Sequence, residues 1–340
     1  MRPLLCATVT GTTLRELRAA RDAAVQADLV ELRLDGVRDV DVAGALEGRR
    51  RPVIVTCRPV WEGGRFDGSE EERRRLLHDA RRLGAEFVDI EWRTGEAGRL
   101  SGRDGRGVIV SIHEFGEIPS DLEDRVTDAA ASGAEVVKVA IRAERLTDLV
   151  RLAAIGRRLP GRAVLVAMGP AGLPSRVLAA RLRSRWTYAG SLAEAGQIPV
   201  ERLVEQYRFR SVTETTRLYG IVGRPLGHSV SPAMHNAGFA QAGLDAVYVP
   251  FEAADADDFL AFAAAFGVEG ASVTAPFKVE FLARAAEVEP RARRIGAVNT
   301  LRAGPRGWAA TNTDAPGFLE PLAARLELRG LRAAVLGAGG

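Results

Sequence analysis

The sequence predicts an α/β protein of two domains, an N-terminal (β/α)8 barrel followed by a smaller α/β domain. The chain has 340 residues, which exceeds one typical domain of about 100 to 200 residues. Over residues 1–212, short β-branched runs alternate regularly with arginine-rich amphipathic segments. Beyond that range glycine, proline, serine and asparagine become prominent, and all three asparagines of the chain lie there. This change in amino-acid composition favours two domains over one.

Eight runs in the first part have the composition of buried strands. They are LLCATV (4–9), LVELRLD (29–35), VIVTCR (53–58), EFVDIEW (86–92), GVIVSIH (107–113), VVKVAI (136–141), AVLVAMG (163–169) and WTYAGS (186–191). Helix-length segments separate them, such as 13–26 and 121–133. Eight strands spaced in this way are typical of a closed parallel barrel rather than an open sheet, and functional side chains in such barrels lie at the C-terminal strand ends.

The second part begins near residues 211–216, before the new β-run LYGIVG. We assign residues 1–212 to the barrel, 213–331 to the second domain and 332–340 to the first strand and glycine turn of a dinucleotide-binding unit. A pyrophosphate site also needs the N-terminus of the following helix, so Gly337, Gly339 and Gly340 would form an incomplete cofactor site. We therefore expect the cofactor domain to be missing, and an ordinary glycine turn is the alternative.

The basic residues are almost all arginine: of 47, only Lys138 and Lys278 are lysine, each within an apolar run. Lysine can lose its proton when desolvated, whereas arginine stays charged, so the pair indicates two chemical sites. The alternative is an arginine-biased composition that left two surface lysines. The net charge of +3 comes from arginines interleaved with acidic residues. No basic stripe with stacking aromatics or zinc motif accompanies them, which favours an anionic small molecule over nucleic acid or a metal site.

Cysteine content and hydropathy predict the compartment. Cys6 and Cys57 lie in strand-like runs, and two cysteines in 340 residues cannot form a disulfide framework. No apolar stretch reaches about 18 residues, and the N-terminus lacks the pattern of a secretory leader. We expect a cytoplasmic protein with no membrane span. A homodimer is compatible with this sequence.

Polar residues occupy the predicted C-terminal strand ends, where a purely structural strand would be apolar. These residues are Glu31, Arg33, Arg58, Glu91, His113 and Lys138. The apolar run around Lys138 should desolvate its amine, and a neutral amine is what Schiff-base chemistry requires. His113 ends the neighbouring strand, and Glu91 could orient it by accepting its ring proton. Taken singly, His113 and Glu91 also fit a barrel-mouth histidine and a salt-bridge partner.

The segments ELRLD, TCR, DIE, SIHEF, VKVA, MGPAGLPSR and AGQIP resemble type I 3-dehydroquinate dehydratases over residues 1–212. The resemblance implies that Lys138 forms an imine with the substrate ketone and that His113 removes the neighbouring proton, then protonates the departing hydroxyl. Glu91 would hold His113. Substrate hydroxyls and carboxylate would be bound by Glu31, Arg33, Arg58, Arg176 and Gln197, with Arg176 as a bidentate carboxylate clamp.

One position departs from this family. Ala193 stands where the family usually has serine four residues before the glutamine, so one hydroxyl contact is lost. Another Schiff-base barrel, such as a class I aldolase, is the more distant alternative. The SIHEF histidine and the MGPAGLPSR segment favour the dehydratase, which requires no cofactor.

A second site is predicted from GHSVSPAMHN, where Ser231 is placed to cap a helix that has Pro232 at its first position. Such a helix start attracts anions, so Ser229 and Ser231 could hold a carboxylate. Lys278 and Asp314 would suit proton transfer to a hydroxyl or ketone, although a surface salt bridge is the simpler interpretation of that pair alone.

The segments GRPLGHSVSPAMHN, VTAPFK, GAVNT and NTD resemble the substrate-binding half of shikimate dehydrogenase, a family that uses NADP. The resemblance implies a three-layer sandwich in which Ser229 and Ser231 bind the shikimate carboxylate. The ring hydroxyls would be bound by Thr274, Asn299 and Asp314, and Lys278 with Asp314 would perform acid/base catalysis. Ser272 and Ala310 replace residues usual in the family. His228 and His235 are interpreted as packing groups.

The two resemblances together predict a lyase that converts 3-dehydroquinate to 3-dehydroshikimate in the shikimate pathway of aromatic amino acid biosynthesis. One alternative is a bifunctional enzyme with a working NADP-dependent shikimate dehydrogenase, if the missing domain is supplied. A third hypothesis makes the second half a module that only binds shikimate or stabilises the barrel.

Overall fold

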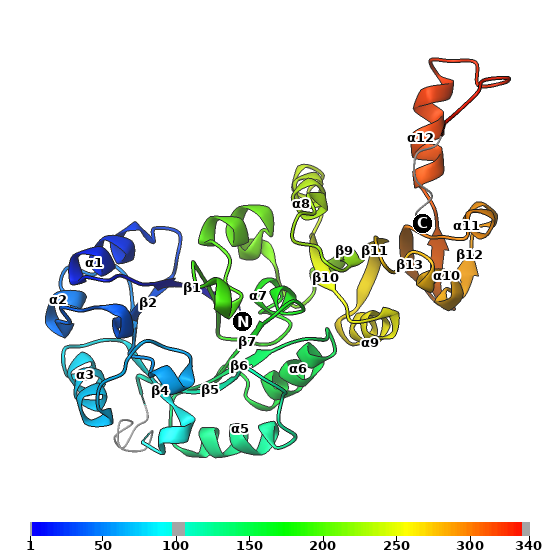
Figure 1. Cartoon of the computed structure of the whole chain (residues 1–340). Coiled ribbons are helices and arrows are strands. Elements are labelled where there is room, and N and C mark those ends of the chain that lie inside the picture. Colours follow the sequence, from blue (N-terminus) through cyan, green and yellow to red (C-terminus); the bar gives the residue numbers. More distant parts are fainter. Residues whose placement is uncertain (1, 97–105, 335–340) are drawn as a thin grey trace. The chain divides into compact units, whose positions relative to one another are not determined.

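The computed structural model describes residues 2–96 and 106–334 of the chain. Contacts divide the chain into two compact units (Figure 1). The first comprises Met1–Glu144 and Asp148–Glu214, and the second comprises Arg145–Thr147 and Thr215–Gly340. Among the described residues, no helix is both long enough and apolar enough to cross a membrane.

The first unit is the predicted barrel of eight parallel strands, in the order β7-β6-β5-β4-β3-β2-β1-β8. Every predicted run contains one strand, so this part of the fold prediction is confirmed. The strands are β1 (Leu4–Val9), β2 (Leu29–Arg33), β3 (Val53–Thr56), β4 (Phe87–Glu91), β5 (Val108–Glu114), β6 (Val136–Arg142), β7 (Ala163–Met168) and β8 (Trp186–Gly190).

The barrel closes between β7 and β8 through a side chain rather than a full backbone ladder. The Arg185 amide donates to the Ala163 carbonyl at 2.8 Å. One step further, the Leu165 amide donates to Ser184 Oγ at 2.9 Å, and that hydroxyl donates to the Trp186 carbonyl at 2.7 Å. Ser184 therefore satisfies buried backbone groups at the seam, which would otherwise destabilise the barrel.

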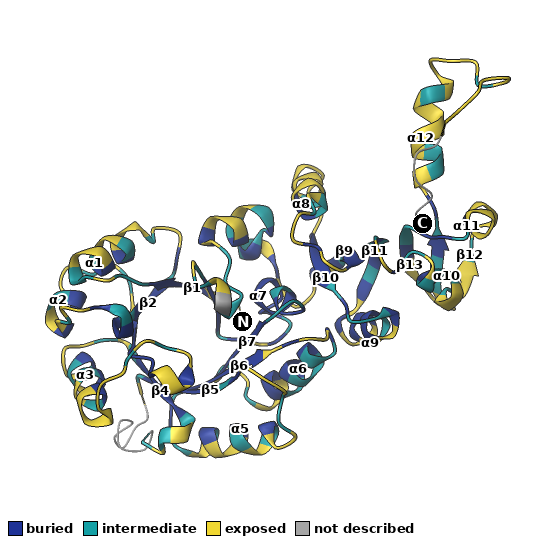
Figure 2. Ribbon diagram, in the orientation of Figure 1, coloured by how far each residue is buried: buried dark blue, intermediate teal, exposed yellow. Residues whose placement is uncertain are grey.

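Helices cover the outside of the barrel, with buried residues on their inner faces and exposed residues outside (Figure 2). Two begin with side-chain caps: Thr13 accepts from the Glu16 amide, and Ser69 with Glu72 forms a capping box. The helices are α1 (Leu14–Ala23), α2 (Val42–Leu46), α3 (Glu70–Arg82), α5 (Leu122–Ala131), α6 (Asp148–Arg158) and α7 (Leu173–Val177).

The barrel interior changes from apolar to polar along the strands. Near the N-terminal ends, the inward layer is Cys6, Leu29, Ile54, Phe87, Ile109, Val136, Val164 and Trp186. Because side chains alternate between faces, the residue two positions further on each strand also points inward. That second layer, called here the polar layer, is Thr8, Glu31, Thr56, Asp89, Ser111, Lys138, Val166 and Tyr188. Charged groups are thus placed on an apolar floor inside the barrel.

The second unit contains a mixed sheet in the order β10-β9-β11-β13-β14-β12. β9, β10 and β11 are parallel, and β13 with β14 forms an antiparallel hairpin next to β11. The strands are β9 (Arg217–Gly223), β10 (Ala246–Glu252), β11 (Val268–Val273), β12 (Glu287–Val288), β13 (Thr300–Gly304) and β14 (Gly307–Thr311).

Helices pack on both faces of this sheet. His235 of α8 (Ser231–Gln241) stacks on Tyr248 with ring centroids 4.2 Å apart. Phe259 of α9 (Ala256–Phe266) contacts Phe251, which points to the opposite face of β10 from Tyr248. The side chain of Asn236 also bonds both backbone groups of Tyr248 and so satisfies the free edge of β10. The layered α/β arrangement agrees with the predicted fold class.

Three further helices follow α9 in the second unit: α10 (Glu280–Arg284), α11 (Pro290–Ile295) and α12 (Asp314–Ala323). The predicted strand at 332–340 does not form over residues 332–334. Residues 335–340 lie outside the described residues, and with them the predicted cofactor glycines Gly337, Gly339 and Gly340.

Candidate active site

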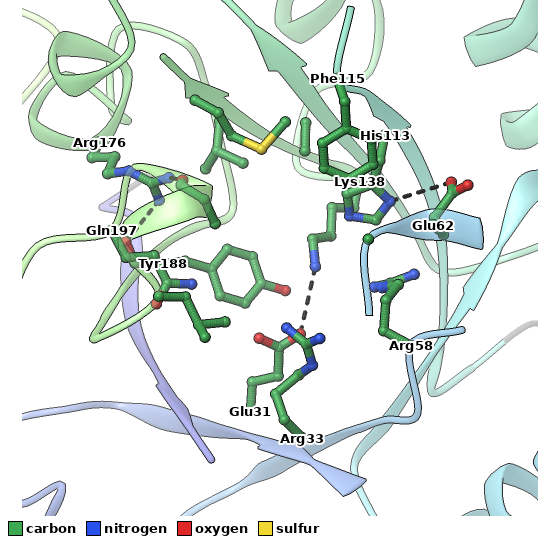
Figure 3. A pocket seen from close by; sticks show the side chains of 16 residues that line it. Glu31, Arg33, Arg58, Glu62, His113, Phe115, Lys138, Arg176, Tyr188 and Gln197 are labelled. Atoms are coloured by element: carbon green, nitrogen blue, oxygen red, sulfur yellow. Dashed lines mark hydrogen bonds and ion pairs between the residues drawn. The ribbon is translucent and has the colours of Figure 1, made fainter. Parts of the chain in front are cut away.

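A pocket opens inside the barrel above the polar layer (Figure 3). Of the predicted barrel residues, all but Glu91 line it. The lining comprises Glu31, Arg33, Arg58, Glu62, Gly63, His113, Phe115, Lys138, Ala140, Val166, Met168, Arg176, Tyr188, Leu192, Ala195 and Gln197. The structure therefore brings these predicted residues together around one pocket, and their roles stay predictions.

Lys138 lies at the centre of the pocket floor. Its Nζ is 2.9 Å from Asp89 Oδ2 and 3.5 Å from Glu31 Oε1. The same nitrogen lies 4.4 Å from the centroid of the Tyr188 ring, within the range of a cation–π contact. The expected burial of this lysine is present, but its amine faces two carboxylates rather than the apolar surroundings that the run VVKVAI indicated. Attack on a carbonyl therefore requires a nearby base to accept a proton from Nζ.

Asp89 is a site residue that the sequence analysis missed. It is fully buried, and its carboxylate contacts Arg58 Nη2 at 2.9 Å, Ser111 Oγ at 2.6 Å and Lys138. Burial alone would raise the pKa of Asp89, but the charges of Arg58 and Lys138 outweigh it and hold the pKa below its ordinary value. Asp89 thus remains an anion that fixes two cations. An acidic residue at an inward position of a predicted strand could have revealed it.

His113 shares the pocket with Lys138. Burial, followed by the positive charges of Arg58 and Lys138, lowers the pKa of His113 well below its ordinary value. The imidazole is therefore neutral near pH 7 and able to accept a proton. Its Nδ1 lies 3.5 Å from Glu62 Oε1, and the ring of Phe115 stacks on it with centroids 6.1 Å apart.

The prediction that Glu91 orients His113 is wrong in this structure. Glu91 Oε1 lies 2.5 Å from Arg58 Nη1, and Oε2 lies 2.6 Å from Arg73 Nη1 of α3. Both carboxylate oxygens are thus engaged by arginines. The carboxylate next to His113 belongs to Glu62, and burial raises the pKa of Glu62 to about 7.

Glu62 was missed because it lies in a 3₁₀ turn, Val60–Glu62, rather than at a strand end. The following Gly63 has a φ of +73°, and a Cβ on Gly64 would lie 2.0 Å from the Arg58 carbonyl oxygen. Only glycine tolerates both conditions, so the pair folds the loop back over Arg58 and presents Glu62 to His113. The sequence Glu-Gly-Gly after a strand was the available indication.

Arg176 is a buried cation without a carboxylate partner among the residues that the structure describes. Its guanidinium donates to the carbonyls of Tyr188 and Ala195, and burial lowers its pKa to about 10. By contrast Arg33 is held by Asp35 through two bonds of 2.8 and 2.9 Å. A cation left uncompensated inside a pocket favours an anionic ligand, since burying an unpaired charge is unfavourable.

Gln197 closes one side of the pocket. Its Nε2 donates to Thr8 Oγ1 at 3.0 Å, and Thr8 in turn donates to Glu31 Oε2 at 2.9 Å. The amide oxygen of Gln197 is buried without a hydrogen-bond partner within the described ranges. The segment after β8 is therefore connected to the carboxylate beside Lys138. Ala193 is exposed in the same segment.

The second unit brings three of its predicted site residues together. Lys278 Nζ lies 2.8 Å from Asp314 Oδ2, and Asn299 Nδ2 donates to Asp314 Oδ1 at 2.7 Å. The hydrogen bond from Lys278 is the main cause that lowers the pKa of Asp314. A lysine and an aspartate in direct contact at the start of α12 can exchange a proton with a bound hydroxyl.

Ser229, Ser231 and Thr274 are not joined to this triad by any hydrogen bond or ion pair within residues 106–334. Ser231 was predicted to be the cap of α8, but it is the first helical residue, and Val230 is the cap position. The reason is that Ser229 Oγ accepts from the Ser231 amide at 3.3 Å, so the supporting hydroxyl comes earlier.

The remaining positions singled out in this unit are two histidines and two departures from the family pattern. His235 packs on Tyr248 as predicted, whereas His228 is exposed. Ser272 accepts a hydrogen bond of 2.7 Å from the Tyr248 hydroxyl. Ala310 is buried in the hairpin opposite Leu301. The two departures from the family pattern therefore do not disturb the Lys278 triad.

The fold and the pocket define a class: a (β/α)8 barrel with a buried lysine and a neutral histidine at the mouth. The model of type I 3-dehydroquinase matches residues 5–214, and the chain belongs to that family. A second model, the shikimate dehydrogenase substrate binding domain, matches residues 221–301.

Known proteins match both units. The bifunctional 3-dehydroquinate dehydratase/shikimate dehydrogenase, chloroplastic, of Arabidopsis thaliana is 32% identical over 338 residues, 94% of this chain and 56% of the relative. Shikimate dehydrogenase (NADP(+)) of Synechococcus sp. (strain JA-3-3Ab) is 47% identical over 134 residues, 38% of this chain and 45% of the relative.

A solved structure agrees with the barrel assignment. The crystal structure of 3-dehydroquinate dehydratase from Geobacillus kaustophilus HTA426 has 30% identity and a TM-score of 0.52, and the match covers 60% of this chain and 89% of that one. The chain spans about half the length of the curated relatives it matches.

Proposed function

We propose that the barrel is a lyase that dehydrates 3-dehydroquinate to 3-dehydroshikimate through a Schiff base on Lys138. The observation that carries the proposal is the pocket shared by Lys138, a neutral His113 and Arg176, a buried cation with no carboxylate partner among the described residues. The family and its relatives support the substrate. The Arg176 guanidinium would bind the substrate carboxylate, which places the ring over Lys138.

The reaction uses groups that the pocket already holds. Nζ of Lys138 attacks the ketone carbon, and the carbonyl oxygen leaves as water, which gives an iminium. His113 then removes a proton from the carbon next to the iminium, and the electron pair moves into an enamine. The enamine nitrogen then restores the C=N bond, and a C=C bond forms between the deprotonated carbon and the carbon that carries the hydroxyl. That hydroxyl leaves as water, with the proton that His113 returns to it. Water hydrolyses the product imine and restores Lys138, so one water is lost overall.

The other pocket residues have supporting roles in this proposal. Glu62 orients His113 and stabilises the imidazolium that forms when the ring accepts a proton. Glu31, Arg33, Arg58 and Gln197 remain predicted contacts of the substrate hydroxyls and carboxylate, and all four line the pocket. Glu91, which is bound to Arg58 and Arg73, keeps its place as a residue that positions Arg58.

For the second unit we propose binding of shikimate or 3-dehydroshikimate, with Lys278 and Asp314 as the acid/base pair. Their contact supports the proposal, together with the match to the substrate binding domain. NADP, named in the Synechococcus relative, would supply the hydride chemistry of a dehydrogenase. The glycines predicted to hold it lie outside the described residues, so only the proton-handling role of Lys278 and Asp314 is assigned. Ser229, Ser231, Thr274 and Asn299 stay predicted substrate contacts.

The lyase proposal is tested by trapping the imine. The protein is incubated with 3-dehydroquinate and borohydride, and the adduct is located by peptide mass spectrometry. We expect one adduct, on Lys138, and loss of turnover when it forms. Lys138→Met should give neither adduct nor enone product, with an unchanged melting temperature for the second unit. Full turnover by an unmodified protein would refute the Schiff base.

Three further assignments remain predictions. The domain limits at 212 and 331 can be tested by limited proteolysis. A homodimer can be tested by analytical ultracentrifugation, and a cytoplasmic location by cell fractionation. The partners we propose are small molecules of the shikimate pathway.

A further inference from the structure

Tyr188 of β8 has a buried hydroxyl whose proton has no acceptor among the described residues. The residue is 2% exposed and belongs to the polar layer. Figure 3 shows its hydroxyl pointing into the pocket toward Lys138 and Glu31. A buried hydroxyl that donates no hydrogen bond is unusual, because buried polar groups are normally hydrogen-bonded.

The side chains around this hydroxyl leave its proton without an acceptor. Trp186 interacts with the phenol oxygen, but its indole N–H is only a donor. Glu31 Oε1 accepts from Thr56 at 2.9 Å and Oε2 accepts from Thr8 at 2.9 Å. Lys138 offers only donors while it is charged, and its Nζ lies over the ring face. Burial, and then the negative charge of Glu31, raises the pKa of Tyr188 well above its ordinary value, so the phenol stays protonated. The Tyr188 phenol is therefore able to donate a hydrogen bond to an oxygen atom of a ligand.

We propose that the Tyr188 hydroxyl donates a hydrogen bond to the substrate oxygen on the carbon that Lys138 attacks. This inference rests on the proposed lyase function. Nζ of Lys138 lies 4.4 Å from the centroid of the Tyr188 ring. A substrate ketone carbon that bonds to Nζ would therefore place its oxygen near the Tyr188 hydroxyl. The donor polarises the ketone and then holds the same oxygen while the carbinolamine forms. Preformed donors aimed at developing oxygen charge stabilise such intermediates.

The protons of this step balance without a further reactant. Lys138 starts with three protons on Nζ. The C–N bond forms, the carbonyl π pair moves to oxygen, and two of the three protons pass through His113 to that oxygen, which leaves as water. One proton stays on the iminium nitrogen. Tyr188 donates a hydrogen bond throughout and keeps its own proton.

The test compares the wild-type protein with Tyr188→Phe, which removes only the hydroxyl. Each is mixed with 3-dehydroquinate, quenched with borohydride after increasing times, and analysed for the Lys138 adduct. We expect imine formation to slow by about 100-fold, the loss that follows removal of one donor from an oxyanion site. KM should change by less than about 3-fold, since the interaction strengthens as the carbonyl reacts.

Tyr207→Phe is the matched control, because Tyr207 is also buried in the barrel unit but does not line the pocket. It should leave imine formation unchanged. Tyr188→Phe should melt close to wild type, since the hydroxyl donates no hydrogen bond within the described residues. Tyr188→Met provides a second variant without the hydroxyl and should show the same loss of rate.

Three results separate the possible failures. A wild-type protein that forms no adduct refutes the lyase proposal itself. A normal wild-type adduct with an unchanged rate in Tyr188→Phe overturns the role of Tyr188 alone. A higher KM with an unchanged rate of imine formation also overturns it, because the hydroxyl would then bind a different substrate oxygen.

Discussion

Glu62 Oε1 lies 3.5 Å from His113 Nδ1, although Glu62 belongs to the 3₁₀ turn Val60–Glu62 and His113 belongs to β5. Burial raises the pKa of Glu62 to about 7, and it lowers the pKa of His113 well below its ordinary value. The pair is therefore neutral or singly negative near pH 7. When His113 takes a proton from the substrate, an ionised Glu62 stabilises the imidazolium that results.

Glu62→Gln should lower kcat by about 10- to 100-fold and leave KM nearly unchanged, because the lost charge acts after the proton is transferred. The pH dependence gives a second measurement. Glu62 is ionised above its pKa of about 7, so wild-type kcat should rise as the pH increases through that value. In the variant this rise should disappear. A rise that persists would show that another group controls it.

Glu91→Gln should behave differently, because Glu91 contacts arginines rather than His113. Breaking a buried ion pair leaves Arg58 and Arg73 without full compensation and costs about 3 to 5 kcal/mol. We expect a large fall in the free energy of unfolding, measured with urea. The folded fraction should keep the rise of kcat near pH 7, which would be lost if Glu91 were the partner of His113.

Asp89→Asn should destabilise the barrel by about 3 to 5 kcal/mol, because Lys138 and Arg58 would lose their buried carboxylate. The pKa of Asp89 is lowered by folding, so its contribution is present above the unfolded pKa of about 3.9 and is lost as the pH falls toward the folded pKa. The stability difference between variant and wild type should be constant above about pH 5 and shrink in acid.

The double variant Asp89→Asn with Lys138→Met supplies the control for that prediction. Removing the lysine together with its partner leaves one fewer unpaired charge, so the double variant should be more stable than Asp89→Asn alone. Urea unfolding of all four proteins gives the coupling energy. A coupling energy near zero would mean that the 2.9 Å contact between Asp89 and Lys138 does not contribute to stability.

The eight strands could be predicted because each is a local run of β-branched residues with its own turn signals. Lys138 and His113 could be predicted for the same reason, since neighbouring strand ends in a barrel face one mouth. The partners of Glu91 could not, because Arg73 comes from α3 and side-chain contact between a helix and a strand depends on packing. Glu62 lies in a turn whose path is set by two glycines rather than by periodicity.

The surroundings of Lys138 show the same limit. The run VVKVAI correctly indicates burial, but Asp89 and Glu31 approach from two other strands. The burial of Lys138 can be inferred from the apolar residues next to it in the sequence. The carboxylates around its amine come from residues about 50 to 100 positions away, and only the closed barrel brings them together.

Arg176 should bind the substrate carboxylate because no carboxylate compensates it among the described residues. Arg176→Gln should raise KM by about 100-fold, the usual cost of a lost charge-assisted bidentate contact, while kcat at saturation changes little. The substrate should raise the melting temperature of wild type but not of the variant. A KM within about 3-fold of wild type would place the carboxylate elsewhere.

In the second unit, shikimate should raise the melting temperature if the proposed site binds it. Lys278→Ala and Ser229→Ala should each abolish this shift, while Arg217→Ala, a surface residue paired with Glu269, should not. Lys278→Ala should also raise the pKa of Asp314 toward its ordinary value, because the bond from Lys278 is the main cause of its lowering. Carbon-detected NMR titration of the aspartates would measure this. Since Asp314 is largely exposed, stability without ligand should hardly change, and a loss of stability would indicate that the pair is only a structural salt bridge.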